Sequence, residues 1–162
     1  MNSESIEIYG NRGRGDSFED FARMVFRRNQ ARKSLFLFGN ASKKYLSALV
    51  KKGVSIKTDK VVITDGTTLK YKNHPKRAKG AFPSMHRFRT VSKAVKNPKN
   101  VYIDKHRSRL IFVSTSNYDK NRVTKVVIEP NQKIKGQYYN KVVSIGVVEK
   151  SKMKDPMYEK IK

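Results

Sequence analysis

The three histidines are the residues of this chain best suited to proton transfer at neutral pH, because an unperturbed imidazole titrates near pH 6.5. They are His74, His86 and His106. None stands three or four residues from another, and no cysteine or paired carboxylate accompanies them, so the sequence predicts neither a metal site nor a cofactor. Each histidine lies among cations instead, and these are Lys72, Lys76, Arg77, Arg87, Arg89, Lys105, Arg107 and Arg109.

A histidine among cations offers the groups that metal-independent cleavage of RNA requires. RNA carries its own nucleophile, the 2′-hydroxyl, so a protein must remove that proton, stabilise charge on the phosphorus and protonate the leaving 5′ oxygen. Acidic residues in the second half of the chain are scattered singly, which disfavours a two-metal nuclease, because its ions need clustered carboxylates. On these chemical grounds alone, Lys105 and His106 are candidates for proton transfer.

The same residues also fit a protein that binds nucleic acid without cleaving it. In that interpretation Arg87 and Arg89 contact phosphate, and a basic hairpin tip from Asp104 to Arg109 forms a wing. Further candidates for nucleic-acid contacts are Lys76, Arg77, Lys105, Arg107 and Tyr118. Composition alone favours binding over catalysis.

The net charge of the chain indicates a polyanionic partner. Its 162 residues hold 37 Lys and Arg against 13 Asp and Glu, a formal charge of +24 with a pI near 10.3. Such an excess repels itself in a compact fold, and it is typical of proteins that bind nucleic acid. No apolar run approaches the roughly 20 residues of a membrane span, and the N-terminus lacks the features of a signal peptide. We therefore expect no membrane span and a cytoplasmic site of action.

Hydrophobic spacing predicts one α+β domain over residues 17–150, with a flexible basic arm over 1–16 and a basic tail over 151–162. Ser17 and Asp20 form a capping pair before the apolar face of the first helix. Further helices are predicted over 41–52, capped by Asn40, and over about 85–96; a basic loop spans 72–83. Strands are predicted over 60–63, 67–71, 101–103, 110–113, 123–128 and 142–148; periodicity does not assign the apolar run 35–38. Short connections favour antiparallel pairing, so the predicted fold is N-terminal helices packed on a four-stranded antiparallel sheet.

One stretch resembles a known group of ribonucleases. It runs HRFRTVSKAVKNPKNVYIDKHRSRLIFVSTSNYDKNRVTKVVIEP from His86 and closes with KVVSIGVVEK. A helix opened by histidine and ended by proline, then an arginine-bearing strand and a final VVSIGVV strand, is similar to the barnase–EndoU–colicin D–RelE-like group, which includes phage-encoded members and toxin domains. The resemblance covers about residues 58–149. It implies catalytic roles for His86, for Arg109 as the phosphate-binding arginine and for Ser144 on the last strand, with His74 as a looser match to a second histidine.

The resemblance shifts the balance toward an enzyme. It implies a toxin-type endoribonuclease that cleaves RNA, tRNA among the possible substrates, without a metal, and that is delivered as part of a larger toxin in some members. Such a domain is expected to have an acidic immunity or antitoxin partner, because charge complementarity suits an inhibitor of a chain at +24. Two alternatives stay open: a non-catalytic DNA- or RNA-binding protein, and a structural component of a nucleoprotein particle.

Overall fold

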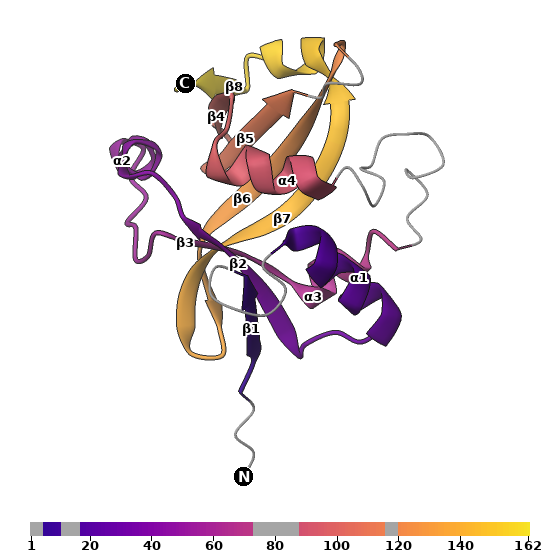
Figure 1. Ribbon diagram of the computed structural model, residues 1–162. Coiled ribbons are helices and arrows are strands. Elements are labelled where there is room, and N and C mark those ends of the chain that lie inside the picture. The colour runs from indigo at the N-terminus through magenta and orange to yellow at the C-terminus, as the bar shows by residue number, and fades with distance from the viewer. Residues whose placement is uncertain (1–4, 11–16, 73–87, 116–119) are drawn as a thin grey trace.

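A computed structural model describes residues 5–10, 17–72, 88–115 and 120–162. Its centre is an eight-stranded sheet with helices over one face, and the strands follow the order β1-β2-β3-β7-β6-β5-β4-β8 (Figure 1). The strands are β1 (Glu7–Gly10), β2 (Ser34–Asn40), β3 (Lys60–Thr64), β4 (Asn100–Asp104), β5 (Arg109–Thr115), β6 (Arg122–Ile134), β7 (Gln137–Glu149) and β8 (Tyr158–Lys160). The helices are α1 (Phe18–Arg28), α2 (Lys43–Lys51), α3 (Asp65–Leu69), α4 (Phe88–Lys96) and the 3₁₀ helix η3 (Lys150–Lys154).

The predicted fold class is wrong, because the sheet is larger and mixed. Strands β4 to β7 pair antiparallel in sequence order, as short connections require, but they form only half of the sheet. Strand β3 joins β7 in parallel, and β1 joins β2 in parallel. These two pairings connect segments that are distant along the chain or separated by α1, and local spacing carries no information about them.

The segment after β3 is a second correction. We expected a turn at Asp65-Gly66 and a return strand over 67–71, whereas residues 65–69 form α3. Thr64 caps this helix by accepting a hydrogen bond from the Thr67 amide at 3.2 Å, and the buried Asp65 carboxylate accepts the amide hydrogens of residues 32, 33 and 34. The threonines that favour a strand locally therefore lie in a helix, because tertiary hydrogen bonds satisfy Asp65 there.

The helix predicted from Ser17 is confirmed, with Ser17 Oγ accepting a hydrogen bond from the Asp20 amide at 3.0 Å. The second helix begins two residues later than expected, because Ser42 rather than Asn40 is its cap. The apolar run 35–38 is the centre of β2. Residues 129–141 lie between the strands predicted over 123–128 and 142–148. In the structure β6 and β7 continue through these residues to a tight turn at Lys135-Gly136.

Both chain ends contribute to the sheet. Residues 7–10 of the expected arm form β1, and residues 158–160 of the expected tail form β8, which pairs antiparallel with β4. The predicted hairpin around 104–109 is confirmed, with Asp104 paired to Arg109 at its base. Among the described helices none is both long and apolar enough to cross a membrane.

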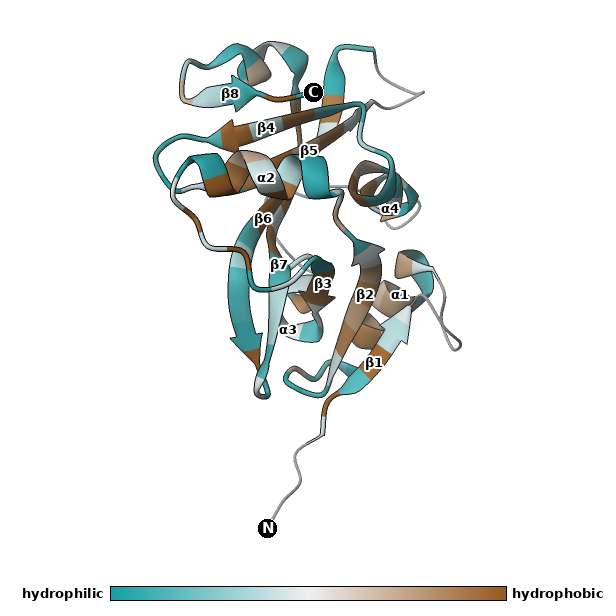
Figure 2. Ribbon diagram, turned by 90° about the vertical axis from the view of Figure 1, so that its left-hand side faces the viewer, coloured by the Kyte–Doolittle hydropathy of each residue, from teal (hydrophilic) through white to brown (hydrophobic). Residues whose placement is uncertain are grey.

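Alternation along the strands divides the apolar residues between two faces. On β5, Leu110 and Phe112 belong to the large core under α1, α2 and α4, whereas Ile111 and Val113 point to the other face. Val62 of β3 likewise points away from that core, between its core neighbours. Hydrophobic colour concentrates on inner strands such as β2 and β4, while β8 is coloured hydrophilic (Figure 2). We call the side without α1, α2 and α4 the open face.

Candidate nucleic-acid interface

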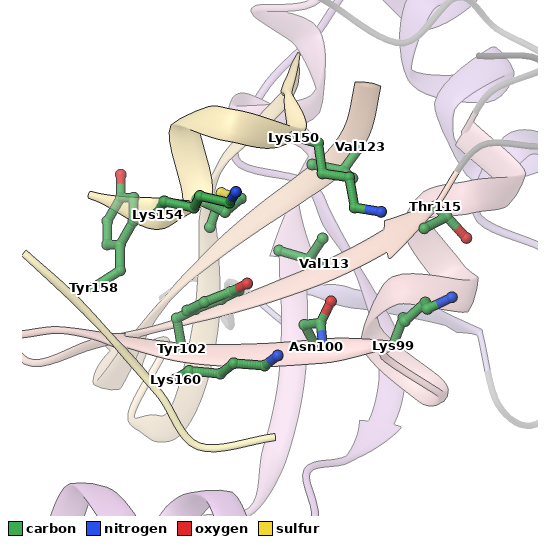
Figure 3. A pocket seen from close by; sticks show the side chains of 11 residues that line it. Lys99, Asn100, Tyr102, Val113, Thr115, Val123, Lys150, Lys154, Tyr158 and Lys160 are labelled. Carbon is green, nitrogen blue, oxygen red and sulfur yellow. The ribbon is translucent and has the colours of Figure 1, made fainter. Parts of the chain in front are cut away.

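The open face carries a basic cavity of about 480 Å³ between β4, β5, β6 and the C-terminal segment. We call it the β8 pocket. Its lining consists of Lys99, Asn100, Tyr102, Val113, Thr115, Val123, Lys150, Met153, Lys154, Tyr158 and Lys160 (Figure 3). The cavity forms because η3 arches over the sheet and anchors itself by one buried side chain, Met153, against Ile111, Val113 and Val123.

Four lysines supply the charge of the β8 pocket, and none of the described residues that line it is acidic. Lys99 precedes β4, Lys150 and Lys154 lie on η3, and Lys160 lies on β8 (Figure 3). Within the described ranges, no ion pair engages any of the four ammonium groups. Four exposed cations without a carboxylate between them repel one another, and an anionic ligand relieves that repulsion.

Strand alternation keeps the nearest carboxylate of β8 away from the pocket. Lys160 pairs with Tyr102 and points to the open face, whereas Glu159 pairs with Ile103, a residue of the core under the helices. Glu159 is bound there by Lys52 at the end of α2, with 2.6 Å between Nζ and Oε1. The hydrogen bond from Lys52 lowers the pKa of Glu159, so this carboxylate is charged and occupied at neutral pH.

Two tyrosines give the β8 pocket an aromatic wall. The rings of Tyr102 and Tyr158 are 6.3 Å apart between centroids and inclined at 55°. Lys125 of β6 holds Tyr158, donating from Nζ to the phenol oxygen at 3.0 Å while lying 5.2 Å from the ring centroid. Burial raises the pKa of Tyr102, so its phenol stays neutral and able to donate a hydrogen bond.

Arg109, the expected phosphate-binding arginine, is occupied by a carboxylate. Its Nε and Nη2 atoms lie 2.6 Å and 2.5 Å from Glu129 Oε2, and both side chains are more than two-thirds buried. Arg89 is likewise bound, its Nε donating to Glu19 Oε1 at 3.0 Å across α1 and α4. A phosphate at Arg109 would compete with Glu129, whereas the Arg89 side chain stays 83% exposed beside its bond to Glu19.

The other described candidates lie in two places on the sheet. Lys105, His106 and Arg107 are exposed in the β4–β5 turn beside Arg109, and the Asp104 carboxylate accepts the amide hydrogens of His106 and Arg107. Ser144 is exposed on β7, two strands away from Arg109, and it pairs with Val127 while Arg109 lies level with Glu129. At roughly 3.3 Å per residue and 4.8 Å per strand, the Cα atoms of Ser144 and Arg109 are about 12 Å apart. The structure therefore brings four of the candidates to one hairpin and places Ser144 on another strand.

The remaining candidates, His74, His86, Lys76, Arg77, Arg87 and Tyr118, lie outside the described residues. Within the described ranges, no group of three acidic or histidine side chains could hold a metal ion.

Sequence analysis missed the lysines of the β8 pocket because it assigned Lys154 and Lys160 to a tail and gave Lys99 and Lys150 no role. A signal was present: Lys150, Lys154 and Lys160 accompany Tyr158 in a short segment with few acids. Basic residues interleaved with an aromatic are typical of a surface that binds nucleic acid. What the sequence did not provide is the pairing of β8 with β4, which brings Lys99 and Tyr102 to the same cavity.

No family model, no curated protein and no solved structure matched this chain. The resemblance to ribonucleases therefore stays a prediction.

Proposed function

We propose that this chain binds single-stranded RNA, with the β8 pocket receiving a phosphate and its attached nucleotide. The observation that carries the proposal is the set of four lysines around one cavity without an acidic lining residue. A cavity of about 480 Å³ matches a nucleotide-sized group, since ligand sites usually measure about 300–1,000 Å³. A pocket of this kind receives a splayed nucleotide of a single strand rather than a continuous duplex groove.

The division of labour within the pocket follows from its residues. The four lysines of the pocket would neutralise the bound phosphate and its neighbours along the strand. Their contribution to the binding affinity falls steeply as the salt concentration rises, because binding releases counterions from the RNA. Tyr158, half-buried and fixed by Lys125, offers a ring edge and face to a base. We name RNA because of the resemblance to ribonucleases, and single-stranded DNA of the same length and sequence serves as the comparison.

Fluorescence anisotropy with a labelled single strand over a range of salt concentrations tests the proposal. The variant Lys99→Gln/Lys150→Gln/Lys154→Gln/Lys160→Gln removes the pocket charge and keeps the side-chain length. Each phosphate contact on a single strand contributes about 0.7 to the slope of log K against log salt, so losing four contacts should flatten the slope by about 2–3. Circular dichroism and thermal unfolding establish that the variant keeps its fold.

A control with the same change in net charge separates the pocket from bulk electrostatics. Lys43, Lys44 and Lys51 of α2 and Lys93 of α4 are exposed and belong to helices on the opposite side of the sheet. Their substitution by glutamine should leave most of the slope in place. Equal losses in the two quadruple variants would refute the β8 pocket as the binding site.

The proposed binding site is independent of the predicted cleavage. The predicted cleavage depends on His86, which lies outside the described residues, and the described candidates for catalysis do not line the β8 pocket. If the chain also cleaves RNA, we propose that an acidic inhibitor covers the β8 pocket, because the four lysines are its complementary surface.

A further inference from the structure

A second basic cavity lies at the other end of the β6–β7 hairpin. It measures about 430 Å³ and borders α3, so we call it the α3 pocket. The lining residues are Ile6, Ala31, Arg32, Thr64, Asp65, Gly66, Thr67, Lys70, Lys133, Ile134, Lys135 and Lys141. Five of these residues are cations and one is an acid.

The one acid of the α3 pocket is already satisfied by the backbone. The Asp65 carboxylate, 2% exposed, accepts the amide hydrogens of Arg32 and Lys33 at 2.8 Å and that of Ser34 at 2.9 Å. These bonds hold Arg32 at a positive φ of 68°, an uncommon conformation for a residue with a side chain. Asp65 thus fixes the segment that carries Arg32. Because its oxygens already accept backbone amide hydrogens, Asp65 competes little with a ligand for the cations of the α3 pocket.

Each pocket is lined by a residue of β6 that points to the open face. Ile134 packs with Leu35, Val62 and Tyr139, residues that point away from the core under the helices, as Val123 does at the start of β6. Val123 lines the β8 pocket and Ile134 lines the α3 pocket. The eleven steps along β6 from Val123 to Ile134 set a maximum of about 36 Å between their Cα atoms, at roughly 3.3 Å per residue.

Between the pockets, the open face adds one further lysine. Lys125 lies on this face of β6, where it donates to Tyr158. The intervening carboxylate, Glu129, is held by Arg109. A stacked strand rises about 3.4 Å per nucleotide, so about ten nucleotides would reach from one pocket to the other.

We infer that the α3 pocket is a second phosphate-binding subsite for the same single strand, so that one RNA chain of about ten nucleotides spans both pockets. This inference rests on the proposed function of the β8 pocket. A strand that is bound in one pocket reaches the second pocket intramolecularly. A strand long enough for both pockets therefore binds with a higher affinity than a strand that occupies only one.

Strands of two lengths distinguish one subsite from two. We choose about five and about fifteen nucleotides, within the range of site sizes that single-strand-binding domains occupy. At saturation in low salt, titration by anisotropy and calorimetry should give two short strands or one long strand per protein. The long strand should bind at least tenfold more tightly than the short one.

The variant Arg32→Gln/Lys70→Gln/Lys133→Gln removes three exposed cations of the α3 pocket. It should reduce the number of bound short strands from two to one and flatten the salt slope of the long strand by about 2, at roughly 0.7 for each lost contact. The matched control is Lys43→Gln/Lys44→Gln/Lys51→Gln on α2, on the opposite side of the sheet, which should keep both properties. Thermal unfolding checks the fold of each variant.

The inference is overturned if the unaltered protein binds one short strand and the α3-pocket variant binds the long strand with an unchanged slope. In that case the proposed function stands, provided that the quadruple variant of the β8 pocket loses the short strand. If neither strand binds the unaltered protein, the proposed function itself fails and the second subsite fails with it.

Discussion

Removing the hydroxyl of Tyr71 tests how the edge of β7 is completed. β7 pairs with β3 at Asn140 and Lys141, and among the described strands none continues along this edge of β7 beyond that point. Tyr71 supplies the missing acceptor, because its phenol oxygen accepts the Ile145 amide hydrogen at 2.7 Å. Both residues are buried, with 8% of Tyr71 and 2% of Ile145 exposed.

Tyr71→Phe leaves this amide without a partner while the ring stays in place. An unsatisfied buried donor costs about 1–3 kcal/mol, and the space left by one oxygen does not hold a water molecule. A loss of about 2 kcal/mol corresponds to a decrease in Tm of about 4–8 °C for a chain of this size. Differential scanning calorimetry and urea unfolding at neutral pH measure both quantities.

The pH dependence provides a second readout of the same group. Burial raises the pKa of Tyr71, and the hydrogen bonds with Ile145 and Ser144 offset this only in part. Its folded pKa lies above the unfolded value near 10, so the stability from this group is complete below pH 10 and is lost as the pH rises through the folded pKa. The stability difference between Tyr71→Phe and the unaltered protein should therefore narrow above pH 10.

The matched control is Tyr138→Phe, which removes a surface hydroxyl that lies 3.5 Å from Lys57 Nζ. Its effect should stay within about 0.5 kcal/mol, as for most surface substitutions. If Tyr71→Phe changes the Tm no more than Tyr138→Phe does, the role assigned to Tyr71 at the edge of β7 is wrong.

Two further predictions concern the expected catalytic residues. Arg109→Gln should lower the free energy of unfolding by about 1–3 kcal/mol, measured in urea, because it leaves the largely buried Glu129 carboxylate without its cation, and it should leave RNA affinity unchanged; a selective loss of affinity would return Arg109 to the binding site. If the chain cleaves RNA as the resemblance implies, total RNA in EDTA should yield discrete fragments on a denaturing gel, and His86→Ala should reduce that cleavage by about 10²-fold or more while RNA binding persists. Equal cleavage by His86→Ala would exclude that histidine, and intact RNA with both proteins would exclude the enzyme.

Local patterns identified most of the individual elements. The Ser17 cap, the strand over 60–63 and the hairpin at Asp104–Arg109 depend on contacts between residues that are close in sequence, and all three are present. The segment after β3 shows where such patterns fail. Thr67 and Thr68 favour strands locally, but Asp65 gains three amide hydrogens from a segment more than thirty residues away by starting a helix. Patterns of neighbouring residues cannot predict these hydrogen bonds, because the partners are distant in the sequence.

The candidate site was less accessible from the sequence than the elements. Charge and composition predicted a polyanionic partner, and the lysines that line the β8 pocket are part of that charge. Their grouping depends on β8 pairing with β4, which closes a loop of more than fifty residues. In the sequence, Arg109 looked available for phosphate binding. Nothing in its neighbourhood indicated that Glu129 would lie beside it on the adjacent strand.

By itself, the sequence determined the charge of +24, the Ser17 cap, the turn between Asp104 and Arg109, and the alternation that gives each strand two faces. These properties depend on composition and on neighbours within a few residues. The tertiary structure alone decided that the sheet has eight strands, that Glu159 faces Lys52 rather than the lysines beside it, and that two basic pockets border the β6–β7 hairpin. Such outcomes depend on which distant strands pair, and that choice is made by the burial of the whole core rather than by any segment of it.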